Sequence, residues 1–222
     1  MGVRERKLRD KEALREKIIA AATELFREES YAAVSMRKIA KRIEYSVGTL
    51  YLHYRDKDQL FLAVQEQAFE RAFAYIRASA EQPTPLEQLY DLGHRYIDFG
   101  IRNPDLYRLM FMMEHPMEAL DDSEGWRSGI KLHQLLMDIV RRCMEEGAFP
   151  GTDPNNMSFL LWSIVHGMVS LRVSHRLDIY TGDHLEDCPV YPNLDEKIET
   201  TYRMAMQLLS QTAGLPQPAA DR

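Results

Sequence analysis

The sequence predicts an all-α protein of about nine helices, built as a three-helix N-terminal head followed by a helical bundle. Three observations lead to this fold class. Apolar residues recur at three- and four-residue steps along most of the 222-residue chain, as they do on the buried face of a helix. These segments begin at capping residues such as Ser35 and Asp153 and end at breakers such as residues 82–85, Gln-Pro-Thr-Pro. No stretch makes a convincing strand, and no internal repeat is visible.

The first predicted helix covers residues 10–29 and follows a basic arm, residues 1–9, which we expect to be mobile. The arm is either a solvated tail or an additional contact to phosphates. The helix carries an apolar stripe that would cover the next two helices, comprising Leu14, Ile18, Ala21, Ala22, Leu25 and Phe26.

Residues 35–57 predict two short helices joined by a tight turn. Ser35 can cap the first of them, whose inward face carries Ile39, Ala40 and Ile43. Ser46 can cap the second, in which Leu50 is the inward residue. Two short helices of this kind form a helix-turn-helix when a third helix packs across them, and the second helix then enters the major groove of DNA.

A long fourth helix, capped by Asp56, is expected to end before residue 82. It begins in the head and ends in the body, so a signal that passes between them should move it. The other helices are expected at residues 86–100, 104–113, 125–146, 154–176 and 193–212. The predicted domains are 1–57 for the DNA-binding head, 58–213 for an effector-binding and dimerisation body, and 214–222 for a disordered tail.

The eighth helix is apolar on all sides, because 10 of the 15 residues between Phe159 and Val173 are apolar. Such a helix must be buried on more than one side, by its own core and by a partner surface. Together with the last helix it would form a four-helix interface between two copies of the chain. We expect this interface to include Phe159, Val169, Val173, Ile198, Tyr202, Ala205 and Leu209.

The distribution of charge favours a nucleic-acid partner, although the net charge of −6 does not. Residues 1–57 carry 14 Lys and Arg against 9 Asp and Glu, whereas the rest of the chain carries 14 against 25. A basic head on an acidic body is typical of a DNA-binding module attached to something else. The acidic body should also weaken indiscriminate binding to DNA.

The two cysteines, Cys143 and Cys188, are too few for a disulfide framework or a tetrahedral metal site, which favours a reducing cytoplasm. The charged N-terminus has no apolar region of the kind found in signal peptides. The apolar stretch 159–173 is too short and too polar to span a bilayer. We therefore expect a cytoplasmic protein with no membrane partner.

The segment IAKRIEYSVGTLYLHYRDKDQL resembles the N-terminal signature of TetR/AcrR-type transcriptional regulators, and the similarity runs from about Leu14 to Val64. The residues in register with that signature are Gly48, Thr49, Leu50, Tyr51, Tyr54, Lys57 and Leu60. Where the family usually has Gly-Val in the turn, this chain has Glu44-Tyr45. Glu44 must therefore adopt or avoid the left-handed conformation that glycine takes freely, at some cost.

The resemblance implies roles in DNA binding for nine residues. Arg37 is expected to reach a base edge or a phosphate. The leading face of the second short helix would comprise Ser46, Val47, Gly48 and Tyr51, and phosphate contacts would come from Thr49, His53, Tyr54 and Lys57. Gly48 permits close approach to DNA, and Val47 or Tyr51 can contact a thymine methyl group. The alternatives are that Tyr51 and Tyr54 are core aromatics and that Lys38, Lys41 and Arg42 form a solvated face.

Trp162, His166 and Gly167 resemble a Trp-x-x-x-His-Gly pattern in one subgroup of TetR-type C-terminal domains. One interpretation is packing, with Gly167 allowing helices to approach and His166 making one buried hydrogen bond. The other is an apolar effector pocket with His166 as its polar anchor. Its lining would be Tyr96, Phe99, Met110, Met113, Trp126, Leu136, Trp162 and His166.

The resemblance and the residues together predict a homodimeric repressor that binds a palindromic operator and is released by a small, mainly hydrophobic effector. The alternative is a constitutive regulator whose body only dimerises. Metal binding by His184 and Cys188, with Asp183 and Asp187 beside them, is a third possibility that the neighbouring Gly182 and Pro189 disfavour. Motifs of hydrolases, P-loop proteins and dinucleotide-binding enzymes are absent from the sequence, so we expect neither an enzyme nor a cofactor.

Overall fold

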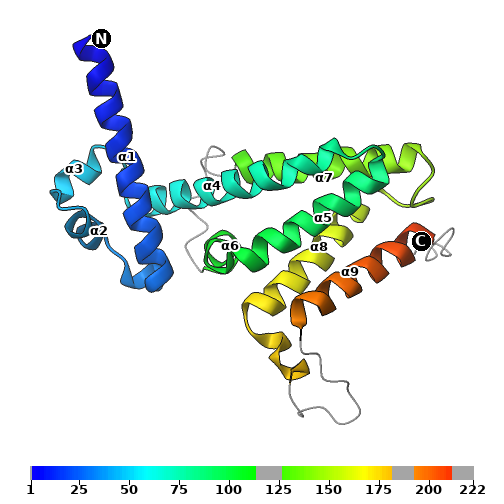
Figure 1. Cartoon of the computed structure of the whole chain (residues 1–222). Helices are drawn as coiled ribbons and strands as arrows, with labels where there is room; N and C mark the ends of the chain where they lie inside the picture. Colours follow the sequence, from blue (N-terminus) through cyan, green and yellow to red (C-terminus); the bar gives the residue numbers. More distant parts are fainter. Residues whose placement is uncertain (1, 114–126, 182–192, 212–222) are drawn as a thin grey trace, which may run out of the picture. The chain divides into compact units, whose positions relative to one another are not determined.

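The computed structural model describes residues 2–113, 127–181 and 193–211, and within these ranges it is entirely helical (Figure 1). The nine α-helices in these ranges are α1 (Val3–Glu28), α2 (Met36–Arg42), α3 (Val47–Tyr51), α4 (Lys57–Ile76), α5 (Pro85–Arg102), α6 (Pro104–Phe111), α7 (Arg127–Glu145), α8 (Pro154–Val173) and α9 (Leu194–Gln211). Three short 3-10 turns lie at Tyr31–Ala33, Arg77–Glu81 and Arg176–Tyr180. The predicted all-α fold is confirmed. None of the described helices is long and apolar enough to cross a membrane.

Helix α1 begins at Val3, so the prediction of a separate arm before residue 10 is wrong for residues 3–9. The backbone N–H of Gly2 donates to the Glu5 carboxylate at 2.9 Å, which satisfies one of the groups that a helix start leaves unpaired. Residues 4–9, Arg-Glu-Arg-Lys-Leu-Arg, are also good helix formers. The basic residues of this segment are therefore carried by a helix rather than by a loose tail.

The chain divides into two compact units, which we describe separately. The first unit takes in residues up to Arg71 together with Asp105–Ile130. Its core joins α1, α2, α3 and the start of α4, and the ring of Phe61 meets those of Phe26 and Tyr31 edge-on, with centroids 4.9 and 5.1 Å apart. The predicted stripe of α1 from Ile18 to Phe26 lies in this core.

Two adjacent residues of α4 attach other helices to it within the first unit. The buried amide of Gln65 donates to the Leu109 carbonyl of α6 at 2.9 Å. The Glu66 carboxylate accepts the backbone N–H of Ser128 at 3.0 Å and its hydroxyl at 2.7 Å, which caps the first turn of α7. Helix α4 is thus held by polar contacts at its middle as well as by its apolar face.

The second unit consists of Ala72–Pro104 and the residues from Lys131 onward. In it α5 packs against α8 and also contacts α9. Helix α8 begins as predicted, because the Asp153 carboxylate accepts the N–H of Asn156 at 3.0 Å. Where α5 meets α9, the hydroxyl of Tyr202 donates to the Tyr90 carbonyl at 2.9 Å and fills the space above Gly93, so this glycine has no room for a side chain.

Candidate nucleic-acid interface

Helix α2 forms the first half of a helix-turn-helix. The Ser35 hydroxyl accepts the N–H of Lys38 at 3.2 Å, which confirms the predicted cap. Ile39, Ala40 and Ile43 are buried in the first unit. The basic residues of the helix lie on its exposed sides.

The turn after α2 is held in an unusual conformation for its sequence. Glu44 adopts the left-handed conformation, with φ of 62°, at a cost of about 1–2 kcal/mol. Contacts on both sides of this residue offset the cost. The Tyr45 N–H donates to the Ala40 carbonyl at 3.0 Å, and the Lys17 ammonium of α1 donates to the Ile43 carbonyl at 3.2 Å. The same ammonium lies 5.1 Å from the centre of the Tyr45 ring, a cation–π contact that fixes the ring.

Helix α3 occupies the position of the recognition helix. The Ser46 hydroxyl accepts the N–H of Thr49 at 3.2 Å, as predicted, and lies 2.8 Å from the Thr49 hydroxyl. Leu50 is fully buried, and the opposite face carries Gly48, Tyr51 and Leu52 at spacings of three and four residues. Tyr51 is 53 % exposed and Leu52 is 80 % exposed. Val47 packs partly against the core instead.

Gly48 has space around it in the free protein. A Cβ atom built on it would meet only the Ser46 hydroxyl, at 3.7 Å, which is ordinary contact. The fold of the described chain therefore does not require glycine at this position.

The cations of α2 fall into two groups. Lys38 pairs with Glu29 at 2.6 Å, and Arg42 pairs with Glu24 and Glu28 of α1 at 3.2 and 2.8 Å. Arg37 and Lys41 are exposed, and neither makes a hydrogen bond or ion pair with any described residue. These two side chains are therefore available to a ligand, whereas Lys38 and Arg42 help to hold α2 against α1.

Tyr54, predicted to contact a phosphate, is instead a core residue. Its side chain is only 3 % exposed, and its hydroxyl accepts a hydrogen bond from Arg15 Nε at 3.2 Å. The ring is needed to close the small core of the first unit, so the alternative interpretation of this tyrosine is the correct one. Burial raises the pKa of its hydroxyl, which keeps the group neutral.

The other residues predicted to contact phosphates are partly engaged within the fold. The Lys57 ammonium donates to the Tyr31 carbonyl at 2.9 Å and lies over the ring of Tyr31, and burial lowers its pKa. Burial also lowers the pKa of His53, with smaller contributions from Lys11 and Arg15. This favours the neutral imidazole, which attracts phosphate less than the charged form.

Sequence reasoning gave no role in DNA binding to Tyr45, Lys41 or Leu52. Each of these side chains is exposed beside the predicted residues. The signal for Leu52 is an apolar residue that follows the buried Leu50 by two positions, out of phase with the core stripe. Tyr45 gives no such signal, because turn residues have no periodicity.

In the second unit the structure brings together three of the residues predicted to line an effector pocket. The Trp162 indole donates to the Tyr96 hydroxyl at 3.3 Å, and this hydroxyl lies 3.1 Å from Nδ1 of His166. Burial lowers the pKa of His166, which favours a neutral ring that can accept from Tyr96. The result is a hydrogen-bonded chain from α8 to α5 and back.

The other predicted lining residues are divided between the two units or lie outside the described residues. Phe99 and Leu136 are buried in the second unit, and Phe99 lies near Tyr75 with ring centroids 6.3 Å apart. Met110 and Met113 belong to the first unit, and Trp126 lies outside the described residues. His184 and Cys188, the residues considered for metal binding, also lie outside them.

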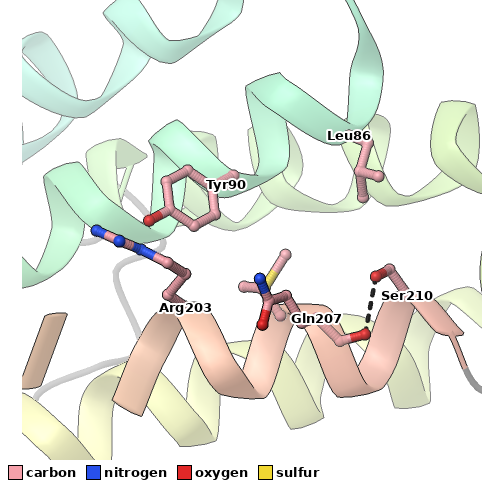
Figure 2. Close-up of a pocket in the computed structure, with 6 residues that line it drawn as sticks. Leu86, Tyr90, Arg203, Gln207 and Ser210 are labelled. Carbon is pink, nitrogen blue, oxygen red and sulfur yellow. Dashed lines mark hydrogen bonds between the residues drawn. The ribbon is translucent and has the colours of Figure 1, made fainter. Parts of the chain in front are cut away.

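A shallow groove lies between α5 and α9 (Figure 2). Its volume is about 260 Å³, below the range of about 300–1,000 Å³ that is usual for small-molecule sites. The groove is lined by Leu86, Tyr90, Arg203, Met206, Gln207 and Ser210. None of the predicted pocket residues lines it.

Four of the residues predicted for the dimer interface lie inside the chain's own core. Val169, Val173, Ile198 and Tyr202 are at most 4 % exposed within the single chain, so they cannot face a partner as predicted. Because α8 is apolar all round, its periodicity did not distinguish the inward face from the outward one. Phe159 is 64 % exposed in the single chain, so its contact with a partner stays a prediction, while Ala205 and Leu209 are half-buried.

The outward faces of α8 and α9 carry other apolar residues. The exposed large side chains on these helices are Phe159, Leu160, Trp162, Leu171, Met204 and Leu208. Gly167 lies one turn before Leu171, and a Cβ atom built on it would meet nothing within 4 Å. The predicted close helix approach at Gly167 is therefore not made within the described chain.

Comparison with known proteins places both parts of the chain in one family. The sequence profile described as bacterial regulatory proteins of the tetR family matches residues 18–64, and the profile of the tetracyclin repressor-like C-terminal domain matches residues 89–188. The HTH-type transcriptional regulator UidR of Escherichia coli K12 is 40 % identical over 67 residues, which are 30 % of this chain and 34 % of UidR. The chain thus matches only about a third of that relative's length.

Solved structures show the same fold over nearly the whole chain. A TetR family transcription regulator from Marinobacter aquaeolei VT8 superposes with a TM-score of 0.63 at 20 % identity, covering 92 % of this chain and 98 % of that one. The regulator FadR from Bacillus subtilis, solved in complex with stearoyl-CoA, superposes with a TM-score of 0.66 at 16 % identity, covering 88 % and 97 %. At these identities the likeness establishes the fold alone. With a tetR-type helix-turn-helix at its N-terminus and a tetracyclin repressor-like domain after it, the chain belongs to the TetR family of transcriptional regulators.

Proposed function

We propose that this chain is a homodimeric, sequence-specific repressor that leaves its operator when a small, mainly hydrophobic effector binds to the C-terminal domain. Residues 1–57 would bind DNA and residues 58–213 would dimerise and bind the effector. The observation that carries the proposal is the exposed face of α3, capped by Ser46 and anchored by the buried Leu50. Arg37 and Lys41 beside it are cations without partners among the described residues. The protein would act as a regulator rather than as an enzyme.

The outward faces of α8 and α9 support the homodimer. Phe159, Leu171 and Leu208 are each at least 46 % exposed in the single chain, and a second copy would cover them. The space over Gly167 allows a helix of the partner to approach α8 closely. A symmetric dimer would read a palindrome whose half-sites lie about 34–36 Å apart, or a multiple of that.

Gly167→Leu tests the homodimer directly. A Cβ atom at residue 167 would meet nothing described within 4 Å, so the variant should fold normally. We expect it to sediment as a monomer at micromolar concentration, while the wild type sediments as a dimer. Phe99→Leu, a change in the core of the same unit, is the matched control and should remain dimeric. A dimeric Gly167→Leu variant would contradict this arrangement.

The hydrogen-bonded chain of Trp162, Tyr96 and His166 supports an effector-binding site in the C-terminal domain. Binding sites are mostly apolar and have a few polar groups that fix the ligand, and this cluster would supply such polar groups. FadR, of the same fold, was solved with stearoyl-CoA, which favours ligands with long acyl chains as the first to test. The Trp-His-Gly pattern would then mark a subgroup with a shared effector site. An effector that fits only one position of α4 would shift the dimer away from DNA.

The alternative is a constitutive regulator whose C-terminal domain only dimerises. Trp162 favours it, because its side chain is 36 % exposed on the same helix as Phe159 and Leu171. In that case the hydrogen-bonded chain would be a structural part of the dimer interface.

The two functions are distinguished by one experiment. Duplexes bound by the full-length protein are selected from a random pool, and the best duplex is titrated with protein in the presence of fatty acids and acyl-CoA thioesters of increasing chain length. An effector should lower operator affinity and raise the melting temperature of the wild type, and His166→Ala should weaken both effects. Operator binding that no ligand in such a panel changes would favour the constitutive regulator, and absence of binding to any duplex would refute the proposed function.

A further inference from the structure

The recognition segment lacks the side chains that most often identify bases. Residues 45–53, Tyr-Ser-Val-Gly-Thr-Leu-Tyr-Leu-His, contain no Arg, Lys, Asn, Gln, Asp or Glu. Guanine is commonly identified by a bidentate Arg or Lys and adenine by a bidentate Asn or Gln. Helix α3 and its two ends therefore cannot form either contact.

The few hydroxyl groups at the start of this segment are largely engaged within it. The Ser46 oxygen accepts the Thr49 N–H, and the two hydroxyls lie 2.8 Å apart in a hydrogen bond of their own. Since one hydroxyl hydrogen is used in that bond, one remains to donate to a base. Hydroxyl groups contact several bases without strong preference, so this pair adds little discrimination.

Apart from the hydroxyls of Tyr45 and Tyr51 and the ring of His53, the segment offers mainly apolar surface. Tyr51 and Leu52 are 53 % and 80 % exposed on the face opposite Leu50, and Gly48 keeps that face low so that it can approach a flat surface. Tyr45 is 45 % exposed at the leading end, and the Lys17 ammonium fixes its ring. We call Tyr45, Tyr51 and Leu52 the apolar reading face.

The exposed cations of α2 favour DNA as the occupant of the apolar reading face. Arg37 and Lys41 are one turn apart on α2, exposed and without partners among the described residues. In a helix-turn-helix the first helix crosses the phosphate backbone while the second lies in the major groove (α2 and α3 in Figure 1). The cations would therefore contact phosphates, and the apolar reading face would lie against base edges.

We propose that this protein identifies its operator chiefly through the C5-methyl groups of thymines, which the apolar reading face contacts in the major groove. The thymine methyl is the apolar group that a base pair presents there, and it distinguishes T·A from C·G without a hydrogen bond. The inference rests on the proposed function, because it names the chemistry by which the same helix selects DNA. The sequence predicts that Val47 or Tyr51 contacts a thymine methyl group. Because Val47 packs partly against the core, we assign the contact to Leu52 in its place, and we keep Tyr51 and add Tyr45.

Deoxyuridine tests the proposal, because it removes only the methyl group from thymine and keeps its pairing and its O4 acceptor. In a duplex selected by the full-length dimer, each thymine of one half-site is replaced in turn and the Kd is measured at fixed salt. Burial of one CH₂-sized group is worth about 0.8 kcal/mol, so each contacted methyl should change Kd about fourfold. We expect such a loss at two or more positions of the half-site.

Variants connect the methyl groups to the side chains. Leu52→Ala should weaken binding to the thymine duplex and abolish the deoxyuridine effect at one position while leaving it at the others. Ile179→Ala, which also truncates an exposed aliphatic side chain but lies far along the chain in the 3-10 turn after α8, is the matched control and should change neither. Tyr51→Ser should remove the effect at a different position.

The possible outcomes separate this inference from the proposed function. Tight, selective binding with no loss on deoxyuridine substitution would overturn the methyl readout and leave the regulator intact. A deoxyuridine effect that persists in full in both Leu52→Ala and Tyr51→Ser would also overturn it. Failure to select any duplex would refute the proposed function and this inference together.

Discussion

Replacing Gly48 with alanine should make the protein more stable and a poorer DNA binder. A glycine inside a helix costs about 0.5–1 kcal/mol relative to alanine, and the new Cβ would meet only the Ser46 hydroxyl at 3.7 Å. For a chain of this size that gain corresponds to about 1–4 °C in melting temperature. The added methyl group projects from the exposed face of α3, where DNA would have to come closest. Holding α3 away from the groove by even one contact should cost at least about 1.4 kcal/mol, or tenfold in Kd.

The assay pairs thermal unfolding with titration of a selected duplex, using the same preparation of full-length protein. The matched control is Ala74→Gly, the reverse change at an exposed position of α4, which should lower the melting temperature and leave the Kd unchanged. If Gly48→Ala binds the operator as tightly as the wild type, this face of α3 does not approach DNA. If the variant is instead destabilised, the space around Gly48 has been misjudged.

Three further changes test separate parts of the structure. Gly93→Ala should lower the unfolding free energy by about 2–4 kcal/mol in urea titration, because the new methyl group displaces the Tyr202 hydroxyl from its hydrogen bond. Adding Tyr202→Phe should restore part of that loss. Full stability of Gly93→Ala would contradict the packing of Tyr202 on Gly93. Burial lowers the pKa of His166, so as pH falls below the 6.5 of a free imidazole the unfolded chain takes up the proton first and the folded state loses stability. The melting temperature of His166→Gln should therefore depend less on pH. An unchanged slope would count against a buried, neutral His166. Arg37→Ala should weaken binding to all duplexes alike and reduce the slope of log K against log salt concentration by about one unit. Lys38→Ala, which breaks the ion pair with Glu29, should change this slope less. Equal slopes for the two variants would show that Arg37 is no more available to DNA than Lys38.

Local chemistry explains why most of the fold could be predicted. The caps of Ser35, Ser46 and Asp153 depend on a side chain and a backbone N–H three residues later, so they can be identified from the sequence alone. The stripe of α1 was equally clear, because the other side of that helix is strongly polar. The helical start at Val3 is not predicted by periodicity, because residues 3–9 are mostly charged and carry no apolar stripe, although their residue types favour helix.

The residues of the candidate site were harder to predict, because which side of a residue faces solvent depends on packing between distant segments. Tyr54 has a hydroxyl group that could bind a phosphate. However, its ring is buried, and its hydroxyl accepts a hydrogen bond from Arg15, 39 residues earlier. On α8 the apolar residues point in all directions, so the sequence does not separate Val169, which is buried, from Phe159, which is exposed. The contact between Tyr96 and His166 joins positions 70 residues apart, so no local sequence pattern predicts it.

Three helical glycines differ in whether the chain's own packing explains why the residue is glycine. At Gly93 the cost of glycine is offset inside the chain, because the Tyr202 side chain occupies the place of a methyl group. At Gly48 and Gly167 a methyl group would make no close contact with any described residue, so nothing in that part of the chain offsets the cost. Both lie where large apolar side chains are exposed, Leu52 beside one and Leu171 beside the other. A helix that gives up stability and exposes apolar surface at the same point gains from a close approach by another molecule, DNA at α3 and a second copy of the chain at α8.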